Sequence, residues 1–286
     1  MTEASKPYGA NPDQGEFWNG PSGQFWVKQD AAMSERLTKI TELLFTPEAL
    51  SDGQKVLDIG CGAGATVFRA ASLVGAKGWV TGLDISQPLL SLAEQKSSNL
   101  PNIDLIQADA QTYAFAAKTY DVVQSRFGMM FFENPIAAFE NIRSAMVPGG
   151  ALQFVCWASF EQNEFFNSPV NVVCQVANLE YDMPTNAPGP MAFSDYQYLT
   201  DILLKAGFQN ISITPKETSL TTRDSVEQDA TLLMQIGPAA RLIKTAELTD
   251  NDYTRIYQAL CALSRSNQGQ GEIRYDATVY VVTASA

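Results

Sequence analysis

The sequence of 286 residues carries 31 acidic and 19 basic side chains, so its net charge is -12 at pH 7, and 45% of its residues are hydrophobic. That charge argues against nucleic acid or anionic lipid as a partner, because binding to either depends on clustered Lys and Arg. No segment approaches the roughly 20 uninterrupted apolar residues of a membrane-spanning helix, and the N-terminus lacks the features of a signal peptide. We therefore expect a soluble, cytoplasmic protein, either a monomer or a homodimer.

Cysteine and histidine content argues against a metal site. The chain has no histidine, and its four cysteines, Cys61, Cys156, Cys174 and Cys261, are scattered. This pattern favours neither a zinc cluster nor a disulfide framework. We predict free thiols and no bound metal.

The N-terminal region divides into a polar stretch, an aromatic stretch and a helix. Residues 1–16 are polar and rich in Gly and Pro, which predicts mobility unless something docks them. The sequence FWNGPSGQFW at 17–26 carries too many aromatic rings for a free linker, and it fits either static packing or a lid over a ligand. Helical spacing of apolar residues predicts an amphipathic helix over 30–44. We group residues 1–45 as a lid segment and helix, preceding a single domain over 46–286.

Strand and helix patterns alternate between residues 55 and 156. The predicted strands cover residues 55–59, 78–83, 103–107, 120–124 and 151–156, and the predicted helices cover 65–74, 88–97 and 135–146. Alternation of this kind indicates an α/β fold with a parallel sheet covered by helices on both faces. Right-handed crossovers place all of these strand ends on one side, where open α/β sheets bind their ligands.

Two insertions interrupt the pattern beyond residue 157. The first, at about 158–193, contains a predicted helix over 164–176 and a loop with three prolines. Ser194 and Gln197 then form a capping-box signature for a helix that stops at Gly207, followed by a strand over 211–214. The second insertion, at about 222–270, has helical patterns over 226–243 and 253–263. A strand over 273–282 closes the chain.

The sequence KVLDIGCGAGATV at 55–67 has the form of a nucleotide-binding loop. Glycines after a buried strand let the backbone turn sharply and approach a ligand. Gly60, Gly62 and Ala65 also fit the dinucleotide pattern, which keeps a nicotinamide-dependent oxidoreductase as a remote alternative.

Three carboxylates at successive strand ends discriminate between ligands. Asp58 precedes Gly60 by two residues, where a negative charge would oppose a pyrophosphate and suit a cationic ligand. Asp84 follows the second strand, the placement expected for a carboxylate that accepts from both ribose hydroxyls. Asp109 follows the third strand and could accept from an adenine amino group. A cationic nucleoside ligand fits all three.

With these motifs the chain resembles the class I S-adenosylmethionine-dependent methyltransferases. VLDIGCGAGA, VTGLDIS, IQADAQ, YDVVQSRFGMMFF and VPGG look like the family's five successive motifs. The arrangement is most similar to the small-molecule group related to ubiquinone and menaquinone C-methyltransferases. The resemblance implies a Rossmann-like doubly wound sheet of seven strands, mostly parallel with an antiparallel last strand.

The resemblance also implies a cofactor site. Its residues would be Asp58, Gly60, Cys61, Gly62, Asp84, Ile85, Asp109, Ala110, Ser125 and Arg126. The backbone at 60–62 would pass the methionine part, with Asp58 near the ammonium. Asp84 would bind the ribose, and the residues after it and around Asp109 would contact adenine. Ser125 and Arg126 would border the methionine and the transferable methyl.

An aromatic wall predicts the substrate side of the site. Its members would be Trp18, Phe25, Trp26, Phe127, Met130, Phe131, Phe132, Trp157 and Phe160. Such a wall fits a small apolar or aromatic molecule, although packing into the core is an equally simple role for 129–132. Arg126 is the one basic residue expected at the mouth of the site, either for recognition of the substrate or a carboxylate or for a structural ion pair. Without histidine, any base must be a carboxylate, Tyr, Lys, Cys or water, and no catalytic residue can be named.

The predicted activity is in-line methyl transfer from S-adenosyl-L-methionine, with S-adenosyl-L-homocysteine as product. An alternative keeps the cofactor and drops the transfer, as in a pericyclase-like enzyme or a binding protein that uses only the sulfonium charge.

Overall fold

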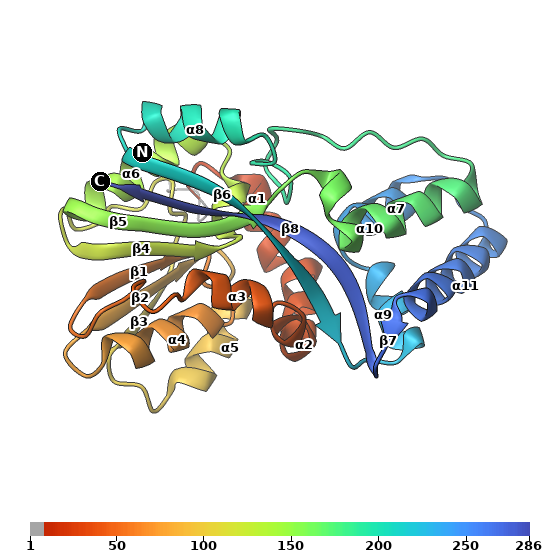
Figure 1. Cartoon of the computed structure of the whole chain (residues 1–286), viewed down its shortest axis with the longest axis horizontal. Helices are drawn as coiled ribbons and strands as arrows, with labels where there is room; N and C mark the ends of the chain where they lie inside the picture. The colour runs from red at the N-terminus through yellow and green to blue at the C-terminus, as the bar shows by residue number, and fades with distance from the viewer. Residues whose placement is uncertain (1–8) are drawn as a thin grey trace, which may run out of the picture.

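A computed structural model describes residues 9–286, which contain one eight-stranded sheet (Figure 1). The strand order is β3-β2-β1-β4-β5-β8-β6, with the short β7 paired to β8. The strands are β1 (Lys55–Ile59), β2 (Trp79–Asp84), β3 (Ile103–Gln107), β4 (Tyr120–Arg126), β5 (Met146–Trp157), β6 (Gln209–Thr222), β7 (Gln268–Gly269) and β8 (Glu272–Ser285). The first five are mutually parallel, and β8 runs antiparallel to β5 and β6. The expected doubly wound sheet with an antiparallel last strand is confirmed, and its seven expected strands form the main path, to which the two-residue β7 adds an eighth.

Helices cover both faces of the sheet, as right-handed crossovers require. One face carries α3 (Thr38–Leu44), α4 (Ala65–Val74) and α5 (Gln87–Ser97), and the other carries α6 (Pro135–Ala145) and α8 (Tyr196–Lys205) (Figure 1). The strands between them are buried on both sides: Val56, Val80 and Val123 are fully inaccessible to solvent. Within residues 9–286 no helix combines the length and apolar character needed to cross a membrane.

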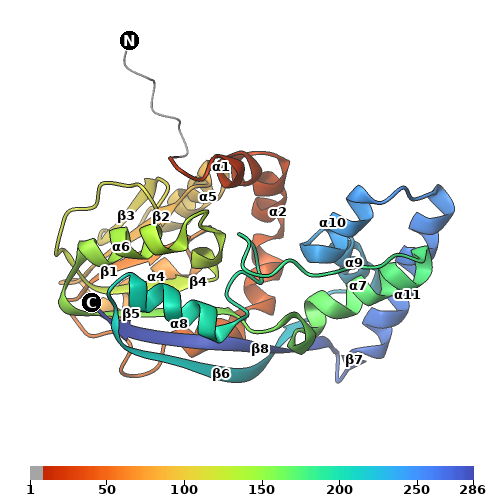
Figure 2. The ribbon, with the colours of Figure 1, turned by 90° about the horizontal axis from the view of Figure 1, so that it is seen from above.

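A separate group of helices lies at the far end of β6 and β8 (Figures 1 and 2). It contains α7 (Glu164–Ala177), α9 (Val226–Leu233), α10 (Gly237–Thr245) and α11 (Asp250–Ser266), all drawn from the two insertions. We call this group the cap. The strands β6 and β8 pair continuously from Ser212 to Thr222. The sequence predicted a strand only over 211–214, because the residues that follow have little alternation of apolar and polar side chains.

The N-terminal region is helical from Pro12 onward. It forms α1 (Pro12–Asn19) and α2 (Pro21–Arg36), and each helix begins with a proline at a first-turn position, where the missing amide hydrogen is not needed. The sequence predicted a mobile stretch over 1–16 unless something docks it; Ala10 and Asn11 are bound to Asp109, residues 12–16 are helical, and the first eight residues lie outside the described part. The predicted helix over 30–44 is divided between α2 and α3 at Leu37.

Two other local predictions need correction. The N-cap of α8 is Asp195 rather than Ser194, since the Asp195 carboxylate accepts from the amides of Gln197 and Tyr198. The helical pattern over 226–243 is split into α9 and α10, because Gly237 adopts a φ of 67° and Pro238 follows it.

Candidate functional site

The glycine loop connects β1 to α4 at the carboxyl edge of the parallel strands. Gly60 has a φ of 66°, and a β-carbon there would lie 2.6 Å from Cα of Gly128, so only glycine fits this close approach between two loops. Gly62 also has a positive φ, of 54°, yet a β-carbon on it would meet nothing within 4 Å. The backbone at Gly62 therefore faces open space.

Asp84 is tied directly to this loop. One of its carboxylate oxygens accepts a 2.7 Å hydrogen bond from the amide of Gly62, and the other accepts a 2.8 Å bond from the amide of Ser86. Burial raises the pKa of the carboxyl, and the backbone hydrogen bonds oppose that rise. Each oxygen keeps a further lone pair for a hydroxyl donor.

Asp58 lies beneath the loop and is fully buried. Nε2 of Gln124 donates a 2.7 Å hydrogen bond to its Oδ2, whereas Oδ1 has no hydrogen-bond partner among the described residues. Burial raises the pKa of Asp58 to about 6, against the lowering effects of Gln124 and Arg126. A nearby cation would stabilise the ionised form.

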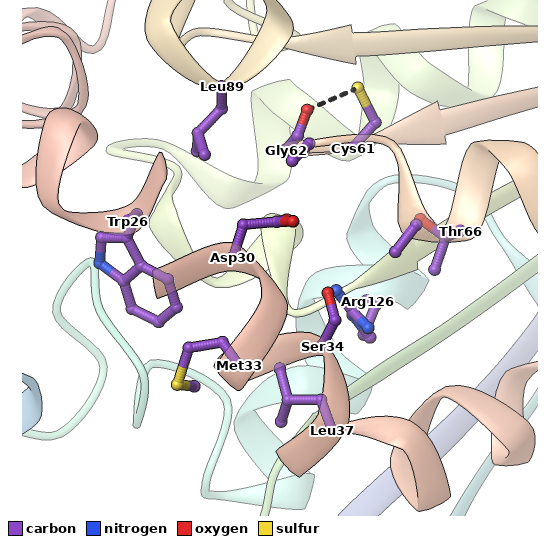
Figure 3. Close-up of a pocket in the computed structure, with 13 residues that line it drawn as sticks. Trp26, Asp30, Met33, Ser34, Leu37, Cys61, Gly62, Thr66, Leu89 and Arg126 are labelled. Carbon is purple, nitrogen blue, oxygen red and sulfur yellow. Dashed lines mark hydrogen bonds between the residues drawn. The ribbon is translucent and has the colours of Figure 1, made fainter. Parts of the chain in front are cut away.

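Helix α2 covers the loop and completes a cavity of about 90 Å³. Four α2 residues on one helical face and Leu37, which follows the helix, line the cavity, and Figure 3 shows them around it together with Cys61 and Gly62. These residues are Trp26, Asp30, Met33, Ser34 and Leu37. The remaining wall comes from the glycine loop, the start of α4, Leu89 and Arg126.

Arg126, at the end of β4, is the basic side chain that lines this cavity. Its Nη1 donates a 2.7 Å hydrogen bond to Oγ1 of Thr41. Burial lowers the pKa of the guanidinium, and the charges of Asp58 and Asp30 oppose that effect. Asp30 forms an ion pair with Lys96 at 2.5 Å. Cationic and anionic groups thus face the same small space.

Asp109 is engaged by the N-terminal segment. Its Oδ1 accepts from Nδ2 of Asn11 at 2.7 Å and from the amide of Gln111 at 2.9 Å, and its Oδ2 accepts from the amide of Ala10 at 2.9 Å. Oδ1 of Asn11 also accepts from the amide of Glu133 at 2.6 Å. The segment therefore joins the loops after β3 and β4.

Other predicted cofactor residues have structural partners. Oγ of Ser125 donates to the carbonyl of Ile59 and accepts from the amide of Gly128. The carbonyl of Ile85 accepts from Nδ2 of Asn19. The side chain of Ala110 is buried. Cys61 is buried as well, and its own burial raises the pKa of its thiol well above the ordinary value.

The predicted substrate residues form two aromatic groups. Trp18 contacts both Trp26 and Phe131, with ring centroids 6.0 and 5.6 Å apart. Phe127 stacks on Trp157 at 4.2 Å with an interplanar angle of 8°. Phe127 holds a φ of 68°, a strained conformation for a side chain of its size. Met130 is buried in the core.

The structure brings only some predicted site residues to the cavity itself. Gly60, Cys61, Gly62, Trp26 and Arg126 line it, and Asp58 and Asp84 lie directly behind the loop. The predicted site residues did not include the other eight lining residues, Asp30, Met33, Ser34, Leu37, Ala63, Ala65, Thr66 and Leu89. The helical spacing from Trp26 to Leu37 was a usable signal, but the predicted helix started only at residue 30.

Comparison with known proteins identifies the part of the chain that contains the glycine loop. Residues 56–150 match the model of a methyltransferase domain. The aklanonic acid methyltransferase of Streptomyces sp. strain C5 is 34% identical over 124 residues, 43% of this chain and 53% of that protein. The demethylmenaquinone methyltransferase of Staphylococcus epidermidis is 35% identical over 98 residues, 34% of this chain and 41% of that protein. The chain thus spans about half, or less, of the length of these relatives.

The fold as a whole has counterparts among solved structures. A proposed methyltransferase of Bacillus halodurans C-125 superimposes with a TM-score of 0.53 at 17% identity, covering 87% of this chain and 97% of that one. At this identity the likeness establishes the fold alone.

Proposed function

We propose, on the premise that residues 56–150 are a class I S-adenosylmethionine-dependent methyltransferase domain, that the whole chain methylates a small apolar or aromatic molecule. The observation that carries the proposal is the Asp84 carboxylate, held by the Gly62 amide at the edge of a cavity that the glycine loop lines. A carboxylate in this position has free lone pairs for the two hydroxyls of a ribose.

The methionine end of the cofactor would lie between Asp58 and Arg126. The unpartnered Oδ1 of Asp58 suits an ammonium group, directly or through water, and Arg126 suits the cofactor's carboxylate or the substrate. Gly60, Cys61 and Gly62 would approach this end with their backbone, and Ser125 would hold the loop near Gly128 in place.

The adenine would lie toward the ends of β2 and β3. Ile85 would pack on it, and Ala110 would lie with Asp109 at its edge. Asp109 reaches the adenine edge only if it exchanges a hydrogen bond from Ala10 or Asn11 for one from the amino group, because the lone pairs of its two oxygens are occupied by these donors, the amide of Gln111 and the hydroxyl of Thr112.

The cavity volume requires movement when the cofactor binds. At about 90 Å³ it is smaller than the ~300–1,000 Å³ typical of small-molecule sites. Helix α2 forms one wall and joins α3 through the single residue Leu37, so we propose that α1 and α2 act as a lid that opens to admit the cofactor.

The substrate would approach from the aromatic groups at the ends of β4 and β5. The stacked Phe127 and Trp157 and the cluster of Trp18, Trp26 and Phe131 suit a planar, apolar molecule. Relatives named for demethylmenaquinone and aklanonic acid favour a quinone-like substrate. Met130 would contribute from the core, behind Phe131.

Catalysis would come chiefly from orientation. The cofactor supplies an activated methyl group, and transfer requires that the acceptor lie in line with it. Residues that exclude water and hold a flat substrate can perform this task, and a base is needed only for an acceptor that starts protonated.

A reducing compartment such as the cytoplasm fits the four free cysteines of the chain. We propose that location and a small-molecule substrate in preference to a nucleic acid, in view of the net charge of -12.

The test is transfer of label. The protein is incubated with methyl-tritiated S-adenosylmethionine and a panel of quinols and phenols, with a boiled sample as control. We expect label in an organic extract together with S-adenosylhomocysteine in equal amount. Cofactor binding without label transfer, both to the panel and to cell extract, would contradict methyl transfer.

A further inference from the structure

A buried arginine connects the lid helix α2 to the cap. Arg36 is the last residue of α2, and only 1% of its surface is exposed. Its Nη1 donates a 2.7 Å hydrogen bond to Oδ1 of Asp229, and its Nη2 donates a 2.7 Å bond to Oδ2 of Asp224. Asp229 is fully buried, and 193 residues separate it from Arg36 in the chain.

The second oxygen of Asp229 extends the connection. Oδ2 accepts from Oγ of Ser264 at 2.6 Å and from the hydroxyl of Tyr275 at 2.5 Å. Asp229 belongs to α9, Ser264 to α11 and Tyr275 to β8. One carboxylate therefore joins α2 to three elements at the cap end of the molecule.

The position of Arg36 on α2 makes this connection relevant to the cavity. Met33, Ser34 and Leu37 line the cavity within one helical turn of Arg36. Figure 2 shows α2 between the sheet and the cap. Because Arg36 attaches the end of α2 to the cap, it determines how far the cavity-lining side of the helix lies from the glycine loop. A buried ion pair adds little net stability compared with apolar side chains, but it can specify one arrangement.

We propose that Arg36 and Asp229 are positioning residues that hold α2 against the cap and thereby set the width of the cavity. Neither residue lines the cavity, so each acts through Met33, Ser34 and Leu37. The effect on cofactor affinity rests on the proposed function, whereas the effect on α2 does not.

The main variant replaces the buried network by apolar side chains of similar size: Arg36→Met, Asp229→Leu, Ser264→Ala and Tyr275→Phe. It leaves no uncompensated charge in the interior except at Asp224, whose side chain is 27% exposed. The matched control is Arg223→Ala. Arg223 forms exposed ion pairs with Glu35 of α2 and Glu272 of β8, so it links the same elements at the surface.

Two properties are measured for each protein, and its thermal unfolding midpoint is recorded as a check on stability. Hydrogen exchange is followed in peptides covering residues 30–36, and S-adenosylhomocysteine affinity is measured by calorimetry. We expect the main variant to unfold within a few degrees of wild type, with exchange in α2 about tenfold faster and affinity about tenfold weaker. The control should match wild type in both, as surface pairs contribute little.

Exchange in α2 that stays within twofold of wild type would overturn the proposal, whatever the affinity. If the main variant does not fold, Asp224→Ala decides instead. It removes the partly exposed half of the connection, and we expect exchange at 30–36 to rise about threefold; no rise overturns the proposal. Wild-type protein that fails to bind the cofactor product would contradict the proposed function, and the exchange measurement would still test the role of Arg36.

Discussion

Oδ2 of Asp58 accepts a 2.7 Å hydrogen bond from Gln124, while Oδ1 of the same buried carboxylate has no partner among the described residues. The pair joins neighbouring strands, since Asp58 lies opposite Gln124 in the register of β1 and β4. A buried carboxylate with one free oxygen next to a glycine loop is costly for the protein alone and favourable once a cation approaches. Two predictions follow from this conflict between stability and binding.

Replacing Asp58 by Asn should change how stability depends on pH. Burial raises the pKa of Asp58 from 3.8 to about 6, so the folded protein holds this proton more tightly than the unfolded chain. The resulting stabilisation is complete below pH 3.8 and is lost as the pH rises through 6. A shift of this size corresponds to about 3 kcal/mol. We compare the free energies of unfolding of Asp58→Asn and wild type, measured in urea at pH 4.5 and pH 8. The difference, variant minus wild type, should be about 2 kcal/mol more positive at pH 8 than at pH 4.5. Equal pH dependence in the two proteins would contradict the buried titration.

Cofactor binding should show the opposite trend. An ammonium group near Oδ1 prefers the ionised carboxylate, so the affinity of wild type for S-adenosylhomocysteine should increase as the pH rises from 5 to 7. Asp58→Asn should bind more weakly at pH 7 and lose this part of the pH dependence. Calorimetry at three pH values measures both effects. The same slope in the variant would mean that another group titrates.

Filling the cavity from α2 should block the cofactor without unfolding the protein. Ser34 lines the cavity, whereas Ala31 is exposed on the same helix. Ser34→Trp places an indole in a space of about 90 Å³, and we expect affinity to fall by at least about 100-fold, since a blocked site loses most of its binding energy. Ala31→Trp should bind like wild type. Equal affinities in both variants would show that the cofactor does not occupy this cavity.

Phe127 offers a test of the substrate wall. Phe127→Gly relieves the positive φ of 68° but removes the ring that stacks on Trp157. Because these effects oppose each other, we expect the free energy of unfolding to change by less than about 1.5 kcal/mol. Methyl transfer to an aromatic substrate should fall by about tenfold, mainly through KM. Tyr196→Ala, at an exposed aromatic residue of α8, is the control. Unchanged transfer would remove Phe127 from the substrate wall.

Local patterns predicted much of the sheet, because the signals lie within the elements themselves. The bounds of β1, β3 and α4 agree with those predicted from apolar runs and bounding glycines. The carboxylates at the strand ends could also be anticipated, because parallel strands end at one edge.

Contacts between distant segments could not be predicted from these patterns. The link from Asn11 to Asp109 joins residues 98 apart, and nothing in the polar sequence around Asn11 indicates it. The pairing of Arg36 with Asp229 depends on the cap folding back over α2. The length of β6 is set by its partner β8, rather than by its own composition.

The central claim is that the carboxylate of Asp84 recognises the ribose of a nucleoside cofactor. Calorimetric titration with S-adenosylhomocysteine tests it most directly, with wild type, Asp84→Ala and the exposed control Glu94→Ala. We expect wild type and the control to bind in the micromolar range, and Asp84→Ala to bind about 100-fold more weakly, since two hydrogen bonds to a charged group are lost. No binding by wild type, or equal binding by Asp84→Ala, would contradict the account.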